Sequence, residues 1–195
     1  MSTLARATRA HYIRLAFTCG VVGVACASLW AAGCSAPDAS ARVDAVGPNR
    51  AQFTSVAPML VRRCGSIDCH GSRFRNLRVY GYGGQRRDGG LRPDEPAKVT
   101  DDEADATYES IVGLEPEIMR AVVQSGGAGP ERLSFVRKAR GDEDHKGDRR
   151  VARGDDSDRC ILTWLANAVD VDACARSGCL VPVGDTGSTI IGSCP

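Results

Sequence analysis

Two cysteines followed at once by a histidine constrain this chain most, because such a group can tie the chain covalently around a prosthetic group. The run reads Cys64-Gly65-Ser66-Ile67-Asp68-Cys69-His70. In c-type haem attachment each thiol adds to a porphyrin vinyl group as a thioether, and the adjacent imidazole binds the iron. Four residues separate the cysteines here, whereas two is the usual number. The motif predicts one covalent haem c on Cys64 and Cys69, with His70 as proximal iron ligand.

The sequence around this motif resembles the monohaem cytochrome c-like domains of bacterial envelope lipoproteins. In that family a Phe-x-x-Val-x-Pro-x-Leu helix leads into the cysteine pair, and here the run is Phe53-Thr54-Ser55-Val56-Ala57-Pro58-Met59-Leu60. Residues 77–81, 145–147 and 158–165 are also similar, so the resemblance extends from about residue 53 to residue 168. It implies a class I cytochrome c-like fold in which an N-terminal helix crosses a C-terminal helix, with Phe53 and Trp164 as the aromatic contact between them.

The N-terminus predicts an exported lipoprotein. Three arginines and no acidic residue precede an uncharged apolar run over residues 15–33, which is the composition of a signal peptide. Leu29-Trp30-Ala31-Ala32-Gly33-Cys34 approximates a lipobox, so we expect cleavage before Cys34 and lipid on that residue. The alternatives are an ordinary signal-peptidase site at residues 25–27 and a permanent membrane span. Ser35 resembles the sorting code for the outer membrane, which predicts a lipoprotein facing the periplasm or the cell surface.

Composition limits the size and the partners of the folded part. With 195 residues, 43% apolar and 5% aromatic, the chain is expected to form one domain with a modest core rather than a multidomain enzyme. Without residues 1–33 it carries 22 basic and 24 acidic side chains, so no nucleic-acid footprint is present. We divide it into a signal peptide (1–33), a flexible tether (34–50), a haem domain (51–170) and a C-terminal tail (171–195).

Apolar periodicity predicts a mainly α domain with long irregular loops. Helices are expected over about residues 53–64, 104–112, 116–125, 130–137 and 157–168, with loops over 81–105 and 139–156. Ser55 is the expected N-cap of the first helix, since Pro58 would then lie in the first turn. Leu77 and Val79 alternate with polar residues and suggest a short extended segment.

Six of the nine cysteines remain after the signal segment and the lipid site are removed. An even number in an oxidising compartment suits haem thioethers and disulfides. Cys160 is expected to pair with Cys174 or Cys179, which leaves the other to Cys194. The tail has too few apolar side chains for a core of its own and is expected to depend on these cross-links.

The sixth iron position decides what such a haem does. His145 is the one imidazole left after His11 of the signal peptide and His70 of the motif. In class I cytochromes c the distal ligand lies in the loop before the C-terminal helix, and the resemblance places His145 in such a loop. Met119 is the alternative ligand, although its apolar neighbours also suit a core position, and an open position is the third. Ligation by His145 would saturate the iron and favour electron transfer over enzymatic chemistry.

Two function classes compete at this point. The first is a lipid-anchored monohaem electron carrier or redox accessory subunit with a partner protein in the envelope. The second is a non-haem structural or interaction lipoprotein with a Cys64–Cys69 disulfide. Zinc held by Cys64, Cys69 and His70 is weaker, because exported cysteines usually oxidise and no second ligand pair has a suitable spacing. An arginine cluster follows the motif: Arg73, Arg75 and Arg78. Three roles remain open for it, which are binding the haem propionates, binding an acidic redox partner, and forming a solvated basic face.

Overall fold

The structure is a computed structural model that describes residues 45–92, 98–183 and 187–190, with side chains as far as residue 178. Its elements are η1 (Arg50–Gln52), α2 (Phe53–Cys64), α3 (Asp101–Val112), α4 (Pro116–Gln124), η2 (Pro130–Arg132), α5 (Ser134–Arg140), α6 (Asp156–Leu165), α7 (Val171–Cys179), β1 (Leu180–Val183) and β2 (Gly187–Ile190). The predicted mainly α fold is confirmed. The predicted signal peptide, Cys34 and Cys194 lie outside the described residues, as does the side chain of Cys179. In the described part no helix is both long and apolar enough to cross a membrane.

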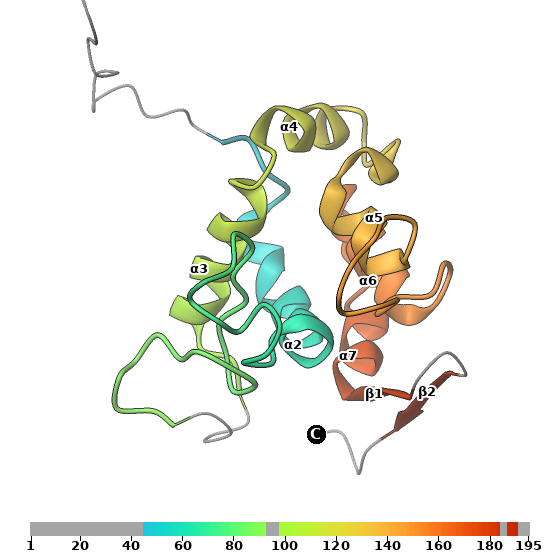
Figure 1. The fold of residues 1–195 in the computed structure, drawn as a ribbon. Helices are drawn as coiled ribbons and strands as arrows, with labels where there is room; N and C mark the ends of the chain where they lie inside the picture. The colour runs from blue at the N-terminus through green and yellow to red at the C-terminus, as the bar shows by residue number, and fades with distance from the viewer. Residues whose placement is uncertain (1–44, 93–97, 184–186, 191–195) are drawn as a thin grey trace, which may run out of the picture. The chain divides into compact units, whose positions relative to one another are not determined.

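Helix α2 is the centre of the domain (Figure 1), and α3, α6 and α7 all pack against it. Its ring contact with α6 is the one predicted, since the centroids of Phe53 and Trp164 lie 5.0 Å apart. Tyr108 of α3 joins them, with its centroid 5.5 Å from that of Phe53. The tyrosine hydroxyl donates to the carbonyl of Pro48 at 2.7 Å, which satisfies its polar end at the core boundary. The aromatic cluster therefore ties α2, α3 and α6 together.

Helix α2 has the predicted bounds but not the predicted N-cap. The helix begins at Phe53, so Ser55 lies inside it and is not the N-cap. The 3-10 turn η1 precedes it, and the Asn49 side chain accepts a hydrogen bond from the backbone N–H of Ala51. Pro58 then lies in the interior of α2, where it removes one backbone hydrogen bond. The residues on either side of Pro58 are fully buried, so their packing offsets that loss.

Capping sets the starts of the other helices. Thr100 and Glu103 form a capping box, so α3 begins at Asp101, three residues earlier than its apolar positions suggest. Glu103 also binds Arg86 in a buried ion pair at 2.6 Å, which fixes part of the predicted 81–105 loop against α3. Helix α4 begins at Pro116 as expected. The segment predicted as a helix from Pro130 divides into η2 and α5, which are separated by an extended residue.

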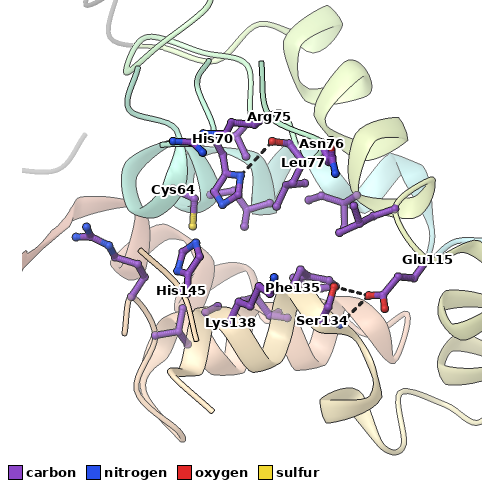
Figure 2. Close-up of a pocket in the computed structure, with 18 of the residues that line it drawn as sticks. Cys64, His70, Arg75, Asn76, Leu77, Glu115, Ser134, Phe135, Lys138 and His145 are labelled. Atoms are coloured by element: carbon purple, nitrogen blue, oxygen red, sulfur yellow. Dashed lines mark hydrogen bonds between the residues drawn. The ribbon is translucent and has the colours of Figure 1, made fainter. Parts of the chain in front are cut away.

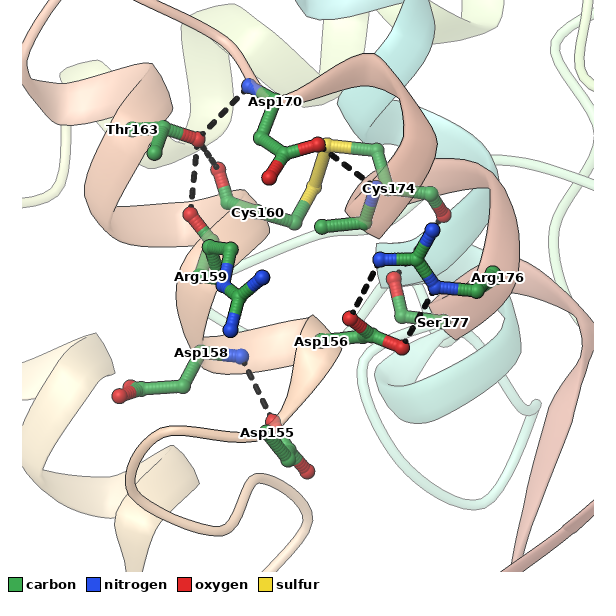
Figure 3. The surroundings of a disulfide bond; sticks show 11 residues. Asp155, Asp156, Asp158, Arg159, Cys160, Thr163, Asp170, Cys174, Arg176 and Ser177 are labelled. Carbon is green, nitrogen blue, oxygen red and sulfur yellow. Dashed lines mark hydrogen bonds and ion pairs between the residues drawn. A yellow bond between two sulfur atoms is a disulfide. The ribbon is translucent and has the colours of Figure 1, made fainter.

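The C-terminal segment contains a helix that the sequence did not predict. Helix α7 packs against α2 and α6, and Ala173, Cys174 and Ser177 are buried. Its first turn is capped by Asp170, whose carboxylate accepts a hydrogen bond from the backbone N–H of Ala173 at 2.9 Å. The Cys160–Cys174 disulfide joins α6 to α7 (Figure 3) and is one of the two pairings predicted for Cys160. Strands β1 and β2 follow as an antiparallel pair.

Candidate functional site

A cavity of about 590 Å³ lies between the segment that follows α2 and the α5 helix with its following loop (Figure 2). This volume is within the range of small-molecule and cofactor pockets, roughly 300–1,000 Å³. Its walls are mainly apolar and come from α2, α3, α5 and α6, with Met59, Leu60, Ile111, Leu114, Phe135 and Ile161 among them. Such walls offer apolar contact to a ligand in the cavity.

Two imidazoles face each other in this cavity. His70 and His145 point toward one another (Figure 2), with ring centroids 5.7 Å apart and ring planes within 12° of parallel. The Nδ1 atom of His70 lies 3.0 Å from the carbonyl oxygen of Leu77. Since a carbonyl only accepts, Nδ1 carries the proton and Nε2 keeps its lone pair. The Nδ1 atom of His145 likewise lies 3.5 Å from the carbonyl oxygen of Asp148, a distance at the limit for a hydrogen bond.

The separation of the two rings suits two ligands on one metal atom. A metal–imidazole bond is about 2.0 Å long and a ring nitrogen lies about 1.1 Å from its centroid, so two imidazoles on one metal atom would have centroids at most about 6.2 Å apart. The observed 5.7 Å is close to that value. Each Nδ1 is turned to a backbone carbonyl, which is the usual way in which a metal-binding histidine is oriented. The residues present therefore fit a haem iron held between them.

The loop that carries His70 is held in place by its own backbone. The N–H of His70 donates to the carbonyl of Cys64 at 3.0 Å, and the N–H of Val79 donates to the carbonyl of His70 at 2.8 Å. Val79 is buried, and the segment that was predicted to be a short strand or extended chain forms no strand. A Cβ atom at Gly71 would lie 2.8 Å from the Cα of Gly84, so only glycine allows these two segments to touch. This contact fixes the motif at the edge of the cavity.

His145 is carried by the loop between α5 and α6. The backbone N–H groups of residues 150 and 151 both donate to the carbonyl of Ala139 at 2.9 Å, which returns the loop to α5. Gly147 is buried, and a Cβ atom there would lie 2.8 Å from Cε1 of the His145 ring. Asp148 adopts a positive φ of 52°, which closes the turn. The glycine leaves room for the imidazole and the turn directs it into the cavity.

The two motif cysteines differ in position. Both are half-buried, but Cys64 lines the cavity beside His70, whereas Cys69 is absent from the cavity wall. Both are free thiols in the structure. Burial raises the pKa of the Cys64 thiol to about 11, so this thiol is protonated at neutral pH. Burial also lowers the pKa of His70, which favours the neutral imidazole that a metal requires.

Met119, the alternative distal ligand, lies elsewhere. It is fully buried within α4 and does not line the cavity. The structure therefore brings Cys64, His70 and His145 together and leaves Met119 in the core.

Three cationic side chains also line the cavity: Arg75, Lys138 and Arg150. Arg75 belongs to the predicted arginine cluster, whereas Lys138 and Arg150 were not predicted, because they come from α5 and from the loop after it. Glu115 is on the same wall, but its carboxylate accepts hydrogen bonds from the backbone N–H and the hydroxyl of Ser134, both at 2.7 Å. The cavity therefore presents positive charge to a ligand that carries carboxylates.

Comparisons with known proteins give no relative for this arrangement. No protein-family model, no curated protein and no solved structure matches the chain. Among the described residues, no group of three or more His, Cys, Asp or Glu side chains is placed to hold a metal ion.

Proposed function

We propose that this protein is a monohaem c-type electron carrier of the cell envelope. The observation that carries the proposal is the facing pair His70 and His145 in an apolar cavity whose wall includes Cys64. The two imidazoles would hold the iron, and Cys64 and Cys69 would hold the porphyrin through thioethers. When bound, the haem supplies a one-electron couple between ferric and ferrous iron.

The chain's own residues would bind the haem, orient its ligands and surround it with apolar side chains. The backbone carbonyl of Leu77 accepts a hydrogen bond from Nδ1 of His70 and so fixes the imidazole. Nε2 is then the nitrogen that is available to the iron. His145 lies on the opposite wall, and ligation by both imidazoles would leave no exchangeable position for peroxide or another small substrate. Arg75, Lys138 and Arg150 suit the carboxylates of haem propionates. These features support outer-sphere electron transfer, by a carrier or by a redox accessory subunit, rather than catalysis at the iron.

The first experiment asks whether the haem is attached. The exported protein is made in a host that matures cytochromes c, and the denatured protein is weighed by mass spectrometry. One added haem is expected, because thioethers survive denaturation. If a control cytochrome from the same host carries haem and this protein carries a Cys64–Cys69 disulfide, the proposal fails and the non-haem lipoprotein is favoured.

The second experiment tests the distal ligand. His145→Ala should convert a low-spin haem spectrum to a high-spin one that binds carbon monoxide, because one iron ligand is lost. Met119→Leu is the matched control, since it replaces a buried side chain outside the cavity with one of similar volume and should leave the spectrum unchanged. Ready carbon monoxide binding by the wild-type ferrous protein would contradict ligation by His145.

We further propose that the mature protein begins at a lipidated Cys34 and is held at the outer membrane. The N-terminal sequence supports this proposal, and Cys34 lies outside the described residues. Cys34→Ser should move the protein from the membrane fraction to the soluble periplasm. A wild-type protein that is already soluble and begins at Ser28 would contradict the lipid anchor.

A further inference from the structure

An exposed aromatic side chain lies among cations at the edge of the cavity. Phe74 is 81% exposed although it lines the cavity. The guanidinium of Arg73 lies over its ring, 4.8 Å from the centroid. Arg75 and Arg78 are also exposed, and residues 72–80 contain no acidic side chain. We call Arg73, Phe74, Arg75 and Arg78 the arginine patch.

The charges of the arginine patch are directed to the backbone rather than to carboxylates. Arg75 donates to the carbonyls of Asp68 and Cys69 at 3.1 and 3.3 Å, and Arg78 donates to the carbonyl of Arg75 at 3.3 Å. Carbonyl acceptors order a guanidinium without neutralising it. Within the part of the chain that the structure describes, no ion pair joins the arginine patch to a carboxylate. Other surface arginines are paired in this way: Arg50, Arg87, Arg137, Arg153 and Arg176.

The position of the arginine patch relates it to the haem-attachment motif. Because Arg75 binds the carbonyl of Cys69, the arginine patch lies directly on the loop that precedes His70. A protein bound to it would be close to the group held in the cavity. Without residues 1–33 the chain carries 22 basic and 24 acidic side chains, so attraction to an acidic partner must come from a local cluster of positive charge.

We propose that the arginine patch is the docking surface for an acidic redox protein, with Phe74 as the apolar centre of the contact. This inference rests on the proposed electron-transfer function and names the class of its partner. Aromatic side chains and arginines are enriched at the centres of protein interfaces, and complementary charge at the rim accelerates encounter. Unpaired arginines around an exposed phenylalanine have both properties.

The test uses a plant-type ferredoxin, an acidic iron–sulfur protein, as the probe. The ferredoxin is immobilised and the binding of this protein is measured by surface plasmon resonance at an ionic strength of about 10 mM, where charge steering is little screened. Arg73→Gln with Arg78→Gln should weaken binding about tenfold, and added salt should abolish the difference. The matched control is Arg132→Gln with Arg159→Gln, which removes the same charge from two exposed positions outside the arginine patch and the cavity wall. The control should bind within about twofold of the wild type.

A second readout follows electron transfer to the haem-loaded protein. Transfer from reduced ferredoxin should slow about tenfold in the Arg73→Gln/Arg78→Gln variant, while transfer from reduced methyl viologen, a small cation, should not slow. Binding that is independent of salt, or equal weakening by both double variants, would overturn the docking surface. Failure of the proposed function would instead show as a protein without covalent haem, and the binding measurement would still decide the role of the arginine patch.

Discussion

The disulfide between Cys160 and Cys174 should supply a large part of the stability of the domain. The two cysteines are 14 residues apart in the sequence. Closing a loop of that length lowers the chain entropy of the unfolded state, which is worth about 3 kcal/mol. Domains of this size have free energies of unfolding of about 5–15 kcal/mol. Cys160→Ala with Cys174→Ala should therefore lower the melting temperature by roughly 6–12 °C.

Urea unfolding followed by circular dichroism would measure this loss, with wild type and variant compared in the same haem state. Reduced wild-type protein is the control, because it loses the cross-link and keeps both sulfur atoms. A free energy of unfolding within about 1 kcal/mol of the wild type would refute the reasoning and assign the position of α7 to its packing against α2.

Two further changes test the distal wall and the contact between α6 and α7. Gly147→Ala should displace the His145 imidazole, because the new Cβ would lie 2.8 Å from Cε1, and part of the haem should become high-spin; Gly89→Ala, in open space, is the control. An unchanged Gly147→Ala absorption spectrum would contradict the assignment of His145 as ligand. Asp156 forms an ion pair with Arg176 at 2.9 Å, which lowers the pKa of the Asp156 carboxyl below its ordinary 3.8 (Figure 3). The pair therefore stabilises the fold above that pH and loses its effect as the pH falls through the lowered pKa. Asp156→Asn should lower the free energy of unfolding at pH 7 by at most about 1 kcal/mol, since the pair is partly exposed. The difference should shrink as the pH falls below 3.8, and a loss that does not depend on pH would exclude the ion pair as the cause.

The candidate site was predictable where it is local in the sequence. Cys64, Cys69 and His70 are nearly contiguous, so their spacing alone pointed to haem chemistry. His145 was found because the chain has three histidines, and its position before α6 agreed with the resemblance. Lys138 and Arg150 were missed because chain folding, rather than sequence spacing, brings them to the cavity with Arg75. The importance of Gly147 depends on the position of a neighbouring ring, which a sequence does not show.

The fold shows the same division between local and tertiary signals. Apolar periodicity located α2, α4 and α6, but the start of α3 depends on a capping box just before its apolar residues. Helix α7 was missed because its buried positions are occupied by small side chains, Ala173, Cys174 and Ser177, which contribute little to an apolar pattern. Their burial comes from contact with α2 and from the bond to α6. Capping by Asp170 was the one local sign of this helix.

The two histidines stand on opposite walls of the cavity and are 75 residues apart in the chain. One central atom bound to both would cross-link the two halves of the domain. By the chain-entropy reasoning used for disulfides, closing a loop of that length is worth about 4.5 kcal/mol, more than the loop closed by Cys160 and Cys174. The occupant of the cavity would thus be a structural member of the fold as well as its redox group. Its loss should separate the walls before any single helix unfolds.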